Sequence, residues 1–233
     1  MKYRRKNEIF FFSEMMVYTV SALFFAIIGH LDIATPEQIN IIYIVFITLS
    51  FSYLFSFELF LKKHDSAVHY KMLKKYYIPT GKEKTGGYKR KGVGAVIVLW
   101  IAYLLCIATM KYRGILSWHV FLIGACFMFA LNSFFIRKVC LLSVLFLHNK
   151  NNCCKNCGIN SWDYAIFASS LIFAPELSTA ATIINWIIIV IAFVELLIWE
   201  ILYYKYPYRF YSETNRTLRC SNCMKQCKFH RND

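Results

Sequence analysis

Two C-x-x-C pairs are the residues of this chain whose type and spacing could do chemistry. Cys154 and Cys157 form the first pair, and Cys220 and Cys223 form the second. Two such pairs are a common way to present four thiolates to one tetrahedral metal ion. The sequence therefore predicts a zinc-type site with these four cysteines as ligands.

Three residues beside these pairs are candidate substitutes or extra ligands: Cys153, Cys227 and His230. An iron–sulfur cluster also takes four thiolates and is the alternative cofactor, with disulfides or unligated thiols as the remaining alternatives. Zinc is favoured because it needs no redox partner, and nothing else in the chain is typical of electron transfer. A site closed by four protein sulfurs is structural rather than catalytic, so we expect it to join the segments that carry the two pairs.

The elements that must position these cysteines are long apolar runs. Of the 233 residues, 58% are hydrophobic, whereas soluble domains have roughly 45–50%. The runs predict an all-α, polytopic integral membrane protein with about six transmembrane helices. The predicted spans cover residues 9–31, 39–61, 93–110, 115–136, 159–175 and 180–204, of which the fifth is short for a bilayer.

Basic residues predict the orientation of these spans. The formal net charge is +14, and Lys and Arg cluster at residues 2–6, 62–91, 137–155 and 205–231, whereas residues 32–40 and 176–179 contain none. Six spans with both termini in the cytoplasm place nearly every basic cluster on one side, as the positive-inside rule requires. Five spans would leave the basic tail outside. We therefore expect a plasma-membrane protein whose basic loops meet anionic headgroups, with no nucleic acid as partner.

The topology divides the chain into two parts and brings the cysteine pairs together. Residues 1–148 hold the first four spans and the basic loop 62–91, and residues 149–233 hold the last hairpin, the cysteine pairs and the basic tail. The turn at residues 176–179 is very short, so the two cytoplasmic ends of this hairpin are neighbours. Cytoplasmic thiols are kept reduced, which favours a metal site over disulfides.

Ionisable groups inside the spans are the other functional candidates, because burying them in a bilayer is costly. Glu58 lies near the cytoplasmic end of the second run and could reach the interface. Asp163 lies in the first turn of the fifth, where a carboxylate also satisfies free backbone amides. Glu195 lies deeper, in the last run, and is the better candidate for a polar lining. We expect the mid-span amides of Asn132 and Asn185 to join helices rather than bind ligands.

The motifs that the chain lacks narrow its function. It has no phosphate-binding loop, dinucleotide-binding fingerprint, H-E-x-x-H or G-x-S-x-G motif. The sequence favours a small transporter, a channel-like component or a membrane adaptor that self-associates or binds a membrane partner protein. The alternative is a membrane-embedded enzyme with an iron–sulfur or thiol redox centre. A third hypothesis is an assembly or signalling partner that binds acidic lipid or protein through its basic loop and tail.

Overall fold

The computed structural model describes residues 2–59, 77–81, 93–137, 160–210 and 214–216, and this part of the chain is helical throughout its apolar segments. The elements are α1 (Lys2–Leu31), α2 (Pro36–Leu59), α4 (Val93–Tyr112), α5 (Trp118–Arg137), α7 (Asn160–Ser170), η1 (Leu171–Phe173), α8 (Thr179–Lys205) and η2 (Pro207–Phe210). The only β pairing among the described residues is an isolated antiparallel bridge between Pro79 and Asn215. Each apolar run predicted from the sequence coincides with one of these helices, and the all-α prediction is confirmed for the described residues.

Within the described part of the chain, three helices are long and apolar enough to cross a membrane. They are Phe12–Leu31 within α1, all of α4 (Val93–Tyr112) and all of α8 (Thr179–Lys205). Large apolar side chains cover their outer faces, as shown by Val17 on α1, Val98 on α4 and Val190 on α8, which are 60%, 66% and 56% exposed. Apolar surface of this extent is atypical of a soluble monomer and is compatible with an integral membrane protein.

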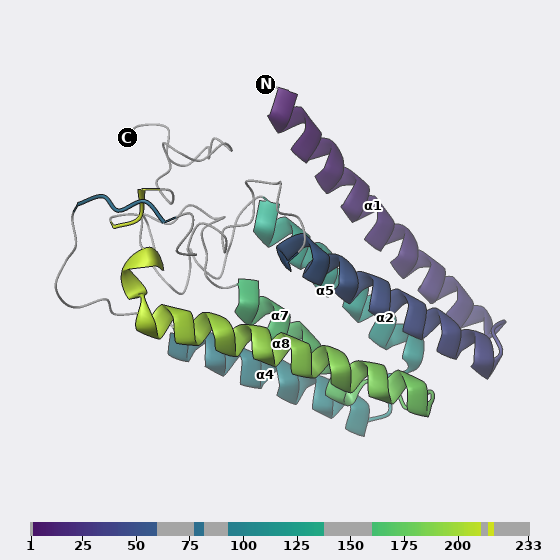
Figure 1. The fold of residues 1–233 in the computed structure, drawn as a ribbon. Helices are drawn as coiled ribbons and strands as arrows, with labels where there is room; N and C mark the ends of the chain where they lie inside the picture. The colour runs from purple at the N-terminus through teal and green to yellow at the C-terminus, as the bar shows by residue number, and fades with distance from the viewer. Residues whose placement is uncertain (1, 60–76, 82–92, 138–159, 211–213, 217–233) are drawn as a thin grey trace.

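The helices form two groups that pack side by side (Figure 1). In the first group, α1 packs along α5, with α2 beside them. In the second group, α7 packs on both α8 and α4. Contacts of α2 with α8 and of α5 with α7 join the groups. The connections α1–α2, α4–α5 and η1–α8 all lie at the same end of the bundle in Figure 1.

Local sequence specifies these three short connections. Thr35 and Gln38 form a reciprocal capping box: the Thr35 amide donates to Gln38 Oε1 (3.0 Å) and the Gln38 amide to Thr35 Oγ1 (3.4 Å). Gly114, after α4, has φ +70°, a conformation that glycine adopts without steric cost. Ser178 caps α8 by accepting a hydrogen bond from the Ala181 amide (3.1 Å). The chain is therefore built to reverse direction at this end.

One continuous core of buried side chains runs through both groups, but its packing differs between them. Aromatic rings fill the space between α1, α2 and α5, where Phe129 packs against Tyr18 and Phe51 with centroid distances of 5.8 and 5.3 Å. Small residues line the contact of α7 with α8, where Ala168 and Ala192 are both fully buried. Small side chains let helix backbones approach closely, which is the usual packing in membranes.

Candidate functional site

The predicted metal ligands lie outside the described residues. This holds for both cysteine pairs and for their candidate substitutes: Cys153, Cys154, Cys157, Cys220, Cys223, Cys227 and His230. Among the described residues, no group of three or more His, Cys, Asp or Glu side chains could hold a metal ion. The metal site therefore stays a prediction from the sequence.

The predicted intramembrane carboxylates lie on three different helices. Glu58 is in the last turn of α2 and Asp163 in the first turn of α7, and their side chains lie outside the described part. Glu195 is half-buried on α8 and interacts with neighbouring groups. Because α7 packs on α8, Asp163 and Glu195 belong to adjacent helices. The polar lining expected from these residues stays a prediction.

Tryptophan indoles tie α7 to the two long helices beside it. Trp162 Nε1 donates to Glu200 Oε1 of α8 (2.7 Å), and Trp100 Nε1 of α4 donates to Ser169 Oγ (2.9 Å). Ser169 in turn donates to the Ile166 carbonyl (2.6 Å). Glu200, near the end of α8, therefore has a specific partner on α7.

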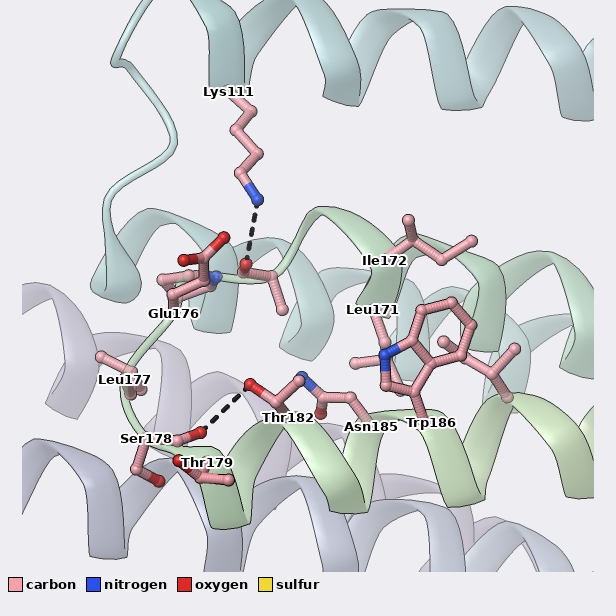
Figure 2. A pocket seen from close by; sticks show the side chains of 13 residues that line it. Lys111, Leu171, Ile172, Glu176, Leu177, Ser178, Thr179, Thr182, Asn185 and Trp186 are labelled. Carbon is pink, nitrogen blue, oxygen red and sulfur yellow. Dashed lines mark hydrogen bonds between the residues drawn. The ribbon is translucent and has the colours of Figure 1, made fainter.

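The sequence did not reveal a pocket of about 540 Å³ between the C-terminal end of α4, the η1–α8 connection and the first half of α8 (Figure 2). This volume is within the usual range for small-molecule sites, roughly 300–1,000 Å³. We call it the turn pocket. Its lining residues are Lys111, Leu171, Ile172, Ala174, Pro175, Glu176, Leu177, Ser178, Thr179, Thr182, Asn185, Trp186 and Ile189.

Two opposite charges stand at the rim of the turn pocket. The Lys111 ammonium donates to the Ala174 carbonyl at 3.4 Å, which draws its side chain toward the connection between η1 and α8 (Figure 2). Glu176 lies two residues further on and is exposed. Among the described residues no ion pair joins Lys111 to Glu176, so each charge is available to a ligand.

A buried amide forms the polar floor of the turn pocket. Asn185 is only 7% exposed, and its Oδ1 accepts a hydrogen bond from the hydroxyl of Tyr43 on α2 (3.0 Å). This bond confirms the expectation that Asn185 joins helices. The bond uses only the oxygen of the amide. The Asn185 Nδ2 group has no hydrogen-bond partner among the described residues and is therefore a donor at the pocket.

Two hydroxyl groups of the turn pocket donate hydrogen bonds within the protein. Ser178 Oγ donates to Asn40 Oδ1 of α2 (2.6 Å), and Thr182 Oγ1 donates to the Ser178 carbonyl (3.1 Å; Figure 2). The lining contains no histidine or cysteine that could act as a base or a thiol nucleophile.

Apolar side chains form the remaining wall. Trp186 and Ile172 line the pocket and are 54% and 47% exposed, so they belong both to the pocket and to the outer surface of the helices. Leu171 and Ile189 are buried behind them. The sequence could not predict this pocket, because it requires α4 to lie against a connection more than sixty residues away in the chain, as the Lys111–Ala174 bond shows.

A second polar cluster lies at the other end of α8, and we call it the tail clamp. Arg209 of η2 is 8% exposed, with its guanidinium 4.0 Å from the ring centroid of Tyr206 and within 6 Å of Tyr77 and Tyr208. Asn215 Nδ2 donates to the Arg209 carbonyl (2.8 Å). Cation–π stacking and this bond fasten residues 77–81 and 214–216 to the end of α8.

Comparison with known proteins gives no further assignment, since no protein-family model, curated protein or solved structure matches the chain. Its function must therefore be argued from the turn pocket, the helices around it and the sequence.

Proposed function

We propose that this chain is a multi-pass membrane protein that acts as a small transporter or channel-like component, with the turn pocket as its ligand site. The observation that carries this proposal is Asn185, a buried polar residue at the floor of a pocket and on α8, the longest candidate span among the described residues. Polar groups within membrane helices are costly, and they commonly face substrate or ion pathways.

The proposed topology has six spans with both termini in the cytoplasm of a plasma-membrane protein. Besides the three long apolar helices, α2 and α5 have 24 and 20 residues, enough for about 30 Å at about 1.5 Å per residue. Helix α7 has 11 residues and η1 has 3, which is short for a bilayer. Because α7 packs between α4 and α8, this shortness creates little hydrophobic mismatch with the lipid. In this orientation the three short connections and the turn pocket face outward.

The proposed structural role of zinc lies at the cytoplasmic end. Cys154 and Cys157 precede α7 in the sequence, and Cys220 and Cys223 follow the tail clamp. This role is supported by the packing of α7 directly on α8. The N-terminus of α7 and the C-terminus of α8, which are the helix ends nearest in sequence to the two cysteine pairs, lie at the same end of the bundle (Figure 1). Zinc bound there by four thiolates would fasten the basic tail beneath the membrane. The tail and loop 62–91 would then meet anionic headgroups.

A flux measurement tests the transport function. Thr182→Cys, in the wall of the turn pocket, is reconstituted in liposomes that hold a mixture of small solutes and a headgroup-labelled phospholipid. We expect solute release or lipid translocation above that of empty liposomes, and its loss when a bulky thiol reagent is attached at position 182. Val190→Cys, which is 56% exposed on α8 and does not line the pocket, is the matched control. The parent chain treated with the same reagent controls for its native cysteines.

Two results would contradict transport. The first is that protein-containing liposomes retain every probe as empty liposomes do, which would favour the membrane-adaptor role instead. The second is that modification at positions 182 and 190 has the same effect, because a pathway through the turn pocket requires the first to block and the second to be neutral.

A further inference from the structure

The rim of the turn pocket has a charge pattern that selects ligands. Lys111 and Glu176 present one ammonium and one carboxylate on the same rim without pairing to each other among the described residues. Asn185 Nδ2 adds a donor at the floor. Such an arrangement complements a ligand that carries an anionic oxygen group and an ammonium group a few bonds apart, because each ligand charge meets an opposite one.

The apolar wall shows how such a ligand enters. Trp186 and Ile172 are about half exposed on the outer surface of the helices, between α4 and α8, which are both long enough to span a bilayer. Figure 2 shows the Trp186 indole on α8 beside Ile172, on the side of the pocket away from Glu176. A hydrocarbon chain could leave the pocket across these two side chains, where the helix surface faces lipid in the proposed orientation.

We infer that the turn pocket binds a zwitterionic phospholipid of the ethanolamine type, with its phosphate at Lys111 and Asn185, its ammonium at Glu176, and its acyl chains across Ile172 and Trp186. This inference rests on the proposed membrane function and names the ligand class of the same site. An ethanolamine ammonium has three donors for the Glu176 carboxylate, whereas a choline headgroup has none and a glycerol headgroup has no positive charge.

Lipid retention by the purified full chain tests this inference. The protein is exchanged into detergent with equal amounts of phosphatidylethanolamine, phosphatidylcholine and phosphatidylglycerol, and the bound lipid is counted by native mass spectrometry. We expect phosphatidylethanolamine to be retained preferentially. Lys111→Gln should lower its retention about tenfold, equivalent to about 1.4 kcal/mol. Glu176→Gln should remove the preference over phosphatidylglycerol. Lys205→Gln and Glu37→Gln, two exposed residues outside the pocket, are the matched controls.

Two outcomes would overturn the lipid assignment. One is equal retention of phosphatidylethanolamine by the parent, Lys111→Gln and Glu176→Gln proteins. The other is displacement of the bound lipid by free phosphoethanolamine at comparable concentration, because the ligand would then be a water-soluble zwitterion that needs no acyl chain. Either result leaves the flux measurement unaffected, so a failed lipid assignment is distinguishable from a failed transport function. A Lys111→Gln protein that does not fold is replaced by Lys111→Met, with the same expected loss.

Discussion

The hydrogen bond between Tyr43 and Asn185 gives the sharpest stability prediction, because it joins α2 to α8 and forms the floor of the turn pocket. Tyr43→Phe removes only the hydroxyl and keeps the ring, whose contact with Phe121 has a centroid distance of 6.2 Å. An unsatisfied buried partner costs about 1–3 kcal/mol, whereas interhelical hydrogen bonds in membrane proteins average about 0.6 kcal/mol. Water in the pocket can replace part of the lost bond, so we expect a loss of about 1 kcal/mol.

A double-mutant cycle isolates this bond. Asn185→Leu replaces the amide by an apolar side chain of similar size. The cycle consists of this variant, Tyr43→Phe and the variant that carries both substitutions. We expect a coupling of about 1 kcal/mol in the free energy of unfolding, measured by denaturant titration in detergent micelles. Tyr112→Phe, at a tyrosine that is 93% exposed, should change stability by less than about 0.5 kcal/mol. Additive effects of the two substitutions, within about 0.3 kcal/mol, would refute the bond as a link between α2 and α8.

Two further predictions concern helix packing and the metal. Gly29→Ala should destabilise the contact of α1 with α5 by about 1–3 kcal/mol, since an added Cβ would overlap the imidazole of His119; Gly124→Ala, which meets open space, should be neutral or slightly stabilising in the same unfolding assay. The Cys220→Ser, Cys223→Ser double variant should lose bound zinc in elemental analysis of the purified protein, and unchanged zinc stoichiometry would contradict the four-thiolate site.

The helices could be predicted from the sequence because their signals are local. The apolar run predicted at residues 180–204 corresponds to α8, Thr179–Lys205. The run predicted at residues 93–110 corresponds to α4, Val93–Tyr112. The end of α4 is marked by Gly114 and the start of α8 by Ser178, both of which have a specific structural role. Hydrophobicity, capping residues and glycine act within a few positions, so the sequence alone carries this information.

The turn pocket could not be predicted because its parts come from separate segments. The sequence did not single out Lys111, because its contact with the Ala174 carbonyl depends on how α4 packs on η1. Asn185 was correctly expected to join helices, but its partner Tyr43 is distant in the chain. The sequence instead pointed to Glu195, because a charged side chain can be identified from the sequence alone. A pocket can be identified only once the fold is known.

Labelling from one side of the membrane tests directly whether the turn pocket is a water-accessible site on the outer side of a membrane protein. A membrane-impermeant maleimide is added to intact cells that produce Thr182→Cys, Val190→Cys or the parent chain. We expect position 182 to react, whereas position 190, exposed on the apolar face of α8, and the parent chain should not react. A reaction at position 182 only after the cells are permeabilised, or an equal reaction at positions 182 and 190, would contradict a water-accessible pocket on the outer side.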